Sequence, residues 1–439
     1  MTMNITGIIA EYNPFHNGHA YQLEQARLRT NADYLVVVMN GDFMQRGLPA
    51  GWNKYTRAAM AVAHGADAVI ELPALYGTAS AEFFATGGVR LLRQLSGVQS
   101  LCFGCETDNT ELLKAIAIHL LNEPEDYRLR LNQLLSEGLS FPKARAQAAC
   151  ETLPNGLVPK EELEFILTQP NNILAIEYIK AILREQSDIT PVPCLRTDKG
   201  YHETSLNVSP DSLLVSSSES VSGNLNLSVA SATAIRNVYN KQGMTSELEA
   251  ALPDTSILKL QNEYGVRSPI SPEDFYPYLQ YCLWRQDIKL TDYLDISEDL
   301  ANRIHSVYRP EFTYEELVEA IVNKQYTYTR IYRCLLHIIL DMRKSTMETQ
   351  LRSNSMHYAR LLAFRKDSSG LLRYWNENSE IPVINKVADG LRKLRNQNCN
   401  LGVDLLEMDI ASAHLYEQVV TKRYGCTAYN DFTQGVIMV

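Results

Sequence analysis

Apolar and polar residues follow two different periods along the first half of the chain. Short apolar runs, partly β-branched, predict buried parallel strands over residues 5–10, 34–39, 68–72, 100–103 and 191–196. Amphipathic patterns predict helices directly after residue 19 and over residues 55–64, 79–95 and 109–121. Strands that alternate with helices in this way are typical of a doubly wound α/β sheet.

The pattern changes near residue 240. Beyond it the strand signal fades and amphipathic helical patterns dominate. A chain of 439 residues is too long for one ordinary core, so two domains are the default. We therefore expect a Rossmann-like doubly wound parallel sheet in residues 1–240 and a mainly α-helical domain in residues 241–439.

The loop after the first strand carries two histidines three residues apart. An Asn-Pro pair breaks the chain, and His16-Asn-Gly-His19 opens the next helix. Free N–H groups and the helix dipole favour an anion there, and a triphosphate is the obvious candidate. His16 and His19 can stabilise charge on a pentavalent phosphorus and on leaving pyrophosphate, and Gly18 allows close backbone approach. The competing interpretation is two surface histidines flanking a turn.

Other strand ends are expected to face the same crevice. If the strand order reverses beside the first strand, Gly104 borders the ligand site and admits the nucleotide; an ordinary strand-to-loop glycine is the alternative. The polar loop 40–47 follows the second strand. Its Arg46, with Lys54 and Arg57, could neutralise phosphates or RNA, although an ordinary exposed loop has a similar composition.

Two later segments predict helix starts. Asn171 or Asn172 is expected to cap a helix after Gln169-Pro170. Ser231 or Thr233 caps another, and Arg236 in its first turns would point toward the same crevice. The fifth strand ends in Arg196.

Composition is that of a soluble globular protein, with 45% hydrophobic and 21% charged residues. No apolar run reaches transmembrane length, and the N-terminus leads into a strand, so we expect a cytoplasmic protein without a membrane partner. Eight scattered cysteines fit free thiols. Cys102 and Cys105 have metal or redox spacing but no second pair, which favours packing.

One stretch differs from the rest in charge. The chain carries a formal net charge of −10, which argues against general nucleic-acid affinity, but residues 321–373 carry +7. The basic residues of this window are Lys324, Arg330, Arg333, Arg343, Lys344, Arg352, Arg360, Arg365, Lys366 and Arg373, interleaved with Tyr326, Tyr328, Tyr332, Tyr358 and Phe364. Arginines with aromatic residues suit phosphate contacts and stacking on unpaired RNA bases. A solvated helical face above core aromatics is the alternative.

Several motifs together carry a family resemblance. They are Glu11-Tyr-Asn-Pro-Phe-His-Asn-Gly-His19, Gly41-Asp-Phe-Met-Gln-Arg-Gly47, Glu71-Leu-Pro73, Pro170-Asn-Asn172 and Ser231-Ala-Thr-Ala-Ile-Arg236. Their order resembles that in the bacterial tRNA(Met) cytidine acetate ligases of the His-x-Gly-His nucleotidyltransferase superfamily. The resemblance continues in Thr329-Arg-Ile331, Tyr358-Ala-Arg360, Ile381-Pro-Val-Ile384 and Asp409-Ile-Ala-Ser412, so it covers nearly the whole chain.

The resemblance implies a two-step ligase. Residues 1–240 would convert ATP and acetate to acetyl-adenylate and pyrophosphate. Residues 241–439 would bind elongator tRNA(Met), whose wobble cytidine would accept the acetyl group and become N4-acetylcytidine. Magnesium is expected with ATP from triphosphate chemistry, and because the sequence shows no dedicated acidic cage, ATP and water would hold most of the ion. No acyl-carrier cofactor is required.

The motifs of the resemblance also assign site residues. The resemblance assigns catalysis to His16 and His19. It assigns ATP binding to Gly7, Ile8, Ile9, Ala10, Glu11, Tyr12, Asn13, Pro14, Phe15, His16, Asn17, Gly18, His19, Ala20, Tyr21, Gln22, Gly104, Asn171, Arg196 and Arg236. From charge alone, the RNA contacts are expected among Arg46, Lys54, Arg330, Arg333, Arg360 and Arg365. No metal-ligating residues are expected.

Two other functions fit parts of the pattern. An adenylyl- or cytidylyltransferase acting on a small phosphorylated metabolite would need no basic window. A non-catalytic RNA-binding factor with a vestigial nucleotide site would bind RNA irrespective of ATP. The Ser-rich segment 205–227 is expected to be a mobile surface loop, or else a segment that closes over the site when tRNA binds.

Overall fold

The computed structural model describes residues 3–154, 158–196 and 230–439. The Ser-rich segment 205–227 lies outside the described residues, so the expectation for it stays a prediction.

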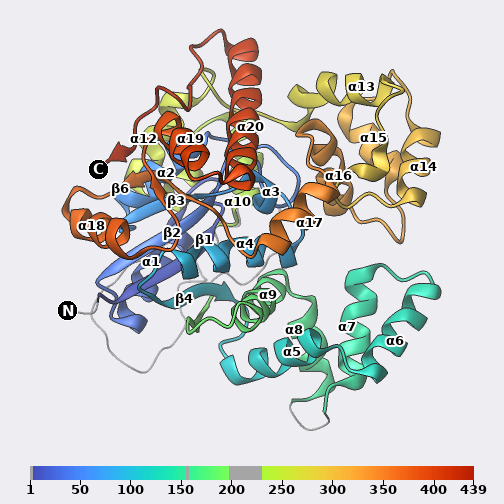
Figure 1. Ribbon diagram of the computed structural model, residues 1–439. Coiled ribbons are helices and arrows are strands. Elements are labelled where there is room, and N and C mark those ends of the chain that lie inside the picture. The colour runs from blue at the N-terminus through green and yellow to red at the C-terminus, as the bar shows by residue number, and fades with distance from the viewer. Residues whose placement is uncertain (1–2, 155–157, 197–229) are drawn as a thin grey trace.

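Five parallel strands form the centre of the molecule (Figure 1). They are β1 (Ile5–Ala10), β2 (Tyr34–Asn40), β3 (Ala68–Leu72), β4 (Val98–Cys105) and β5 (Thr190–Leu195). The sheet order is β5-β4-β1-β2-β3-β6-β7. The chain therefore runs from β1 outward through β2 and β3 and then crosses to the other side of β1 for β4. The predicted switch point beside the first strand is confirmed, and it lies between β1 and β4.

Alternate side chains of the strands enter two cores, one on each face of the sheet. Ile5 and Ile9 of β1 pack on one face with helices that include α4 and α9, whereas Ile8 packs on the other with α1, α2 and α10. The helices of the first half are α1 (Asn17–Thr30), α2 (Lys54–Ala63), α3 (Ala74–Gly77), α4 (Ala81–Gln94), α5 (Thr110–Asn122), α6 (Glu125–Ser136), α7 (Phe141–Thr152), α8 (Lys160–Thr168) and α9 (Pro170–Arg184). Burial of both faces explains why these strands are continuous apolar runs.

The second half is mainly helical, as predicted. Its elements are α10 (Ala232–Gln242), α11 (Ser246–Ala251), α12 (Asp254–Glu263), η2 (Pro272–Phe275), α13 (Tyr276–Trp284), η3 (Leu290–Asp292), α14 (Glu298–Val307), α15 (Tyr314–Ile321), α16 (Tyr328–Ile339), α17 (Lys344–Ser353), β6 (Ala359–Phe364), η4 (Lys366–Ser368), α18 (Ser369–Asn378), β7 (Val383–Ile384), α19 (Val387–Asn396), α20 (Asn400–Tyr424) and β8 (Ile437–Met438). Helices α13 to α16 form a separate lobe with its own core, seen at the right of Figure 1.

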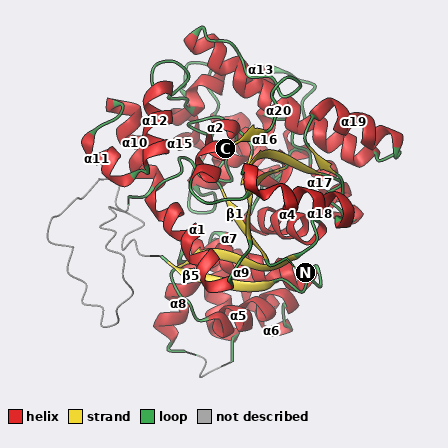
Figure 2. Cartoon of the chain, turned by 90° about the vertical axis from the view of Figure 1, so that its left-hand side faces the viewer, coloured by secondary structure: helices red, strands yellow, loops and turns green. Residues whose placement is uncertain are grey.

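The second half also supplies strands, which the sequence pattern did not predict. β6 pairs antiparallel with β3, and β7 and β8 pair with β6. Helices α10 to α12 share a core with β1 and β2. Residue 240 is therefore not a boundary in the sheet or in this core, although the region beyond it is mainly helical. Figure 2 shows α10, α11 and α12 lying side by side.

All eight cysteines are free thiols, and Cys102 and Cys105 are buried in β4, as the packing interpretation predicts. No helix in the described part of the chain is long and apolar enough to cross a membrane.

Candidate functional site

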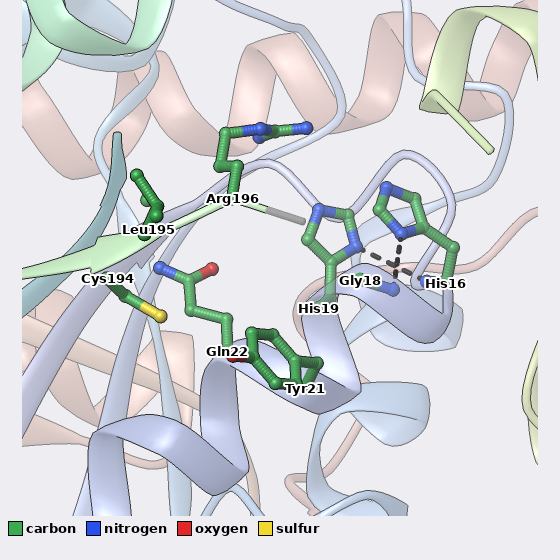
Figure 3. A pocket seen from close by; sticks show the side chains of 9 residues that line it. His16, Gly18, His19, Tyr21, Gln22, Cys194, Leu195 and Arg196 are labelled. Carbon is green, nitrogen blue, oxygen red and sulfur yellow. Dashed lines mark hydrogen bonds between the residues drawn. The ribbon is translucent and has the colours of Figure 1, made fainter. Parts of the chain in front are cut away.

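A pocket opens at the switch point, where the carboxyl ends of β4 and β5 approach the start of α1 (Figure 3). It is lined by His16, Gly18, His19, Tyr21, Gln22, Gly104, Cys194, Leu195 and Arg196. Segments nearly two hundred residues apart thus meet at one sheet edge, because the carboxyl ends of parallel strands all face the same side.

The two histidines form the cap of α1. The Gly18 N–H donates to Nδ1 of His16 at 3.1 Å, and the His16 N–H donates to Nδ1 of His19 at 3.3 Å. This reciprocal arrangement is a capping box built from imidazoles. Since Nδ1 accepts in both rings, a neutral ring carries its proton on Nε2. Each ring can therefore present one N–H to a bound group.

His19 is kept uncharged by its surroundings. Loss of solvent lowers its pKa well below the usual value, and the neighbouring His16 and Arg196 lower that pKa further. His16 stacks on His19 with ring centroids 3.6 Å apart. At neutral pH His19 is therefore a hydrogen-bond donor without a formal charge.

Arg196 supplies the positive charge of the pocket. Its backbone N–H donates to the Cys105 carbonyl at 3.0 Å, which holds it beside the end of β4. A Cβ added at Gly104 would meet the Arg196 side chain at 3.5 Å. This is an ordinary contact distance, so Gly104 and the Arg196 side chain lie next to each other, and the two predicted residues are brought together.

Arg236 lies near the histidine loop, although it does not line the pocket. One guanidinium nitrogen donates to the Asn13 carbonyl at 2.6 Å and another to Thr233 at 3.2 Å. The Asn13 side chain accepts from the Gly51 N–H at 2.9 Å. Ser231 caps α10 by accepting from the Ala234 N–H, as predicted. The Ser231–Arg236 motif therefore supports the loop that carries the histidines.

Arg57 joins the loops after β1 and β2 and is fully buried. Its guanidinium donates to the carbonyls of Glu11 at 2.7 Å, Trp52 at 2.9 Å and Asn40 at 3.1 Å, and also to that of Gly41. The prediction that Arg57 neutralises phosphate or RNA is wrong, because its donors are already used by backbone inside the protein. Its role is to fix the two loops against each other.

Known proteins match this chain over nearly its whole length. The HIGH Nucleotidyl Transferase family matches residues 3–430. A tRNA(Met) cytidine acetate ligase of Halothermothrix orenii is 38% identical over 94% of both chains, and one of Acetivibrio thermocellus is 36% identical over 100% of both. The chain belongs to the tRNA(Met) cytidine acetate ligase family of HIGH nucleotidyltransferases.

Two solved structures extend the similarity to the fold. Thermotoga maritima TmcAL bound with alpha-thio ATP superimposes with a TM-score of 0.84 at 28% identity, and its apo form with 0.86 at 29%. Each match covers 100% of both chains. The α/β fold with a helical C-terminal region is thereby confirmed.

Several other residues to which the resemblance assigns ATP binding do not line the pocket. Gly7, Ile8 and Ile9 are strand residues, and a Cβ on Gly7 would lie 2.6 Å from Leu92 in α4. The side chains of Tyr12, Pro14 and Phe15 are buried in the loop, and Ala10, Glu11 and Ala20 are half-buried. Asn17 donates to the Ala250 carbonyl at 2.9 Å. For these residues, ATP binding stays a prediction.

Asn171 lies at the start of α9, beside the end of β4. Its side chain donates to Glu106 at 2.6 Å, and the Asn172 N–H donates to the same carboxylate at 2.9 Å. The N-cap residue of α9 is Gln169, not Asn171 or Asn172. The expected cap is therefore wrong by two or three residues, because Pro170 takes the first helical position, where its missing N–H costs nothing.

Lys54 and Arg360 are buried and cannot contact RNA as predicted. Their exposed fractions are 1% and 4%. Lys54 pairs with Glu71 and Asp431, each at 2.9 Å, and Arg360 pairs with the same two carboxylates at 3.0 and 2.7 Å. We call Lys54, Glu71, Arg360 and Asp431 the buried ion cluster. It connects β6 and the C-terminal segment to β3.

The basic window is less exposed than its composition suggests. Arg333 pairs with Asp295 at 3.1 Å, Arg365 pairs with Asp67, and Arg330 donates to the Asp295 carbonyl at 3.2 Å. Tyr326 and Tyr358 are buried in cores, whereas Tyr328 is half exposed. The alternative interpretation therefore accounts for much of the window. Arg46, Arg330, Arg333 and Arg365 are only partly buried and stay predicted RNA contacts.

Sequence reasoning missed Cys194 and Leu195 in the pocket lining. Their position directly before Arg196, on the strand next to Gly104, was the available signal. It also missed Glu106 as the partner of Asn171, because a carboxylate beside a predicted phosphate site was not expected.

Proposed function

We propose that this chain activates acetate with ATP as acetyl-adenylate and transfers the acetyl group to the wobble cytidine of elongator tRNA(Met), forming N4-acetylcytidine. The observation that carries the proposal is the capped His16–His19 pair at the switch point, with Arg196 beside it. The names of full-length relatives at 36–38% identity support the choice of acceptor.

The first step forms a mixed anhydride. An acetate oxygen attacks the α-phosphorus of ATP, and the bond from this phosphorus to the oxygen that bridges to the β-phosphate breaks, which releases pyrophosphate. The Nε2–H groups of His16 and His19 would donate to phosphate oxygens as charge builds on them. The Arg196 guanidinium would hold the anionic nucleotide in place.

The second step needs only positioning and a good leaving group. The exocyclic amine of cytidine attacks the acetyl carbon, the bond from this carbon to the AMP oxygen breaks, and the amine releases a proton to solvent. The described residues contain no group of three or more His, Cys, Asp or Glu side chains that could hold a metal ion. Phosphate oxygens and water would therefore supply most ligands of a magnesium ion bound with ATP.

Two assays test the proposal. Acetate-dependent exchange of labelled pyrophosphate into ATP without RNA measures the first step, and acetylcytidine in digested elongator tRNA(Met) measures the second. His19→Ala should abolish exchange and leave tRNA affinity largely intact. The matched control is a tRNA(Met) with uridine at the wobble position, which should bind but accept no acetyl group.

Other results would support the alternatives. Exchange that needs a different small substrate supports a metabolite nucleotidyltransferase. RNA binding without any exchange supports a non-catalytic factor.

A further inference from the structure

Aromatic rings from the loop after β1 pack around His19, which lies in the first turn of α1. The His16 ring stacks on it, and the Tyr12 ring meets it edge to face, with centroids 4.7 Å apart and planes at 62°. Phe15 lies 5.6 Å from His19 and packs edge to face on Tyr12 at 4.9 Å. Rings from three residues therefore limit how the His19 imidazole can turn.

Tyr12 is the least expected member of this group. Its side chain is 1% exposed, and its φ of 49° is in the left-handed region, which is uncommon for a residue other than glycine. This conformation turns the chain after β1, and the ring then lies beside His19. The hydroxyl is buried and has no hydrogen-bond partner among the described residues. The part of Tyr12 that makes contacts is therefore its ring.

We propose that Tyr12 is a positioning residue for the adenylation step, whose ring holds the His19 imidazole with its Nε2–H toward the pocket. This inference rests on the proposed function and gives Tyr12 a role through His19 instead of a contact with ATP. The hydrogen bond from the His16 N–H to Nδ1 of His19 selects the tautomer, and the Tyr12 ring keeps the imidazole plane where this bond can form.

The ring also controls the charge of His19. Among the described residues, the titratable groups that face His19 are His16 from the helix cap, Arg196 directly after β5 and Tyr12 itself. Neither His16 nor Arg196 favours a protonated His19. A smaller aliphatic side chain at position 12 would admit water to the ring and raise the pKa of His19 toward its ordinary value.

The test compares Tyr12→Leu with Tyr12→Phe. Both keep a Cβ at the left-handed position, so they share its backbone strain, and only Tyr12→Phe keeps the ring. In acetate-dependent exchange we expect Tyr12→Leu to lower kcat by at least about tenfold with a change in the KM for ATP below about threefold, because orientation matters most in the transition state. Tyr12→Phe should restore kcat to within about twofold of the wild type. If Tyr12→Leu does not fold, Tyr12→Met, which fills the site without a ring, replaces it.

A measurement on the free protein separates this inference from the proposed function. Nitrogen NMR of labelled histidines, with His19 assigned by subtraction of the His19→Ala spectrum, reports its tautomer and pKa. We expect the Nε2–H tautomer in the wild type and Tyr12→Phe, and a raised pKa with mixed tautomers in Tyr12→Leu.

Each outcome has a definite meaning. Unchanged His19 signals in Tyr12→Leu, or equal losses of kcat in both variants, overturn the positioning role. If no variant and no wild type shows exchange, but the NMR difference is present, the proposed function fails and the positioning of His19 stands.

Discussion

Arg360→Met is the most informative single substitution, because the sequence and the structure give Arg360 opposite roles. In the structure its guanidinium lies 2.7 Å from Asp431 and 3.0 Å from Glu71, and donates to the Tyr55 hydroxyl at 2.8 Å. Methionine fills similar volume without charge. It would leave two buried carboxylates facing Lys54 alone.

The expected magnitude follows from this geometry. Removing one partner of a buried ion pair costs about 3–5 kcal/mol, because the remaining charge stays desolvated. Burial raises the pKa of Asp431, but Lys54 and Arg360 outweigh this effect and hold the pKa well below its usual value. Arg360→Met should therefore lower the free energy of unfolding in urea by about 3–5 kcal/mol. In an Asp431→Asn background the same substitution should lower the free energy of unfolding by less, because one of the uncompensated charges is gone.

A matched surface pair provides the control. Arg352 and Glu348 are 80% and 63% exposed and 3.5 Å apart. Arg352→Met should change the free energy of unfolding by less than about 0.5 kcal/mol. If Arg360 contacted a tRNA phosphate, its replacement would reduce the slope of log K for tRNA binding against log salt concentration by about one. A reduced salt slope together with a stability loss below about 1 kcal/mol would refute the buried role.

Three further predictions follow from single positions. Gly47 has a φ of +78°, and a Cβ there would lie 2.3 Å from the backbone of α16, so Gly47→Ala should lower the free energy of unfolding in urea by at least about 2 kcal/mol. Gly138 has a φ of +86° but open space around it, so Gly138→Ala should lower the same free energy by only about 1 kcal/mol. Burial raises the pKa of Asp42 to about 7, above the value of an unfolded chain. The free energy of unfolding that this protonated carboxyl contributes is fully present below about pH 4 and is lost as the pH rises to about 7, by up to about 1.4 kcal/mol per pH unit. In urea titrations at a series of pH values, Asp42→Asn should lack this slope. Gly104→Val should raise the KM for ATP at least about tenfold in the exchange assay with an unchanged melting temperature, since the nearest neighbours of an added Cβ are Arg196 atoms at ordinary contact distance. An unchanged KM would mean that Gly104 does not border the nucleotide.

The first-half fold could be predicted because its signals are local. The runs at β1, β2 and β3 are apolar on both faces, and the helices between them show their own period. β6 could not be predicted in the same way. Its six residues include Arg360, which interrupts an apolar strand pattern, and the carboxylates that compensate this charge are 289 and 71 positions away.

The candidate site residues also differ in whether a local sequence signal could reveal them. His16, His19, Gly104 and Arg196 were predictable because each lies at the carboxyl end of a strand or shortly after it, and topology brings strand ends together. The basic window, residues 321–373, indicated more exposed positive charge than the fold has, because net charge summed along the sequence does not show which side chains form ion pairs. Arg333 is compensated by Asp295, in an acidic stretch that precedes the window, and Arg365 by Asp67 in the first half.

The buried ion cluster determines how a division of labour between the two halves can be tested. Truncation near residue 240 would remove β6 from the open edge of β3 and leave Glu71 and Lys54 without two of their charged partners. An exposed strand edge beside unpaired buried charges favours aggregation and unfolding. Loss of activity in such a fragment would therefore say nothing about where tRNA binds. Point substitutions at partly exposed residues such as Arg46 and Arg330, with unfolding measured beside tRNA affinity and exchange, can separate binding from folding because they leave the sheet complete.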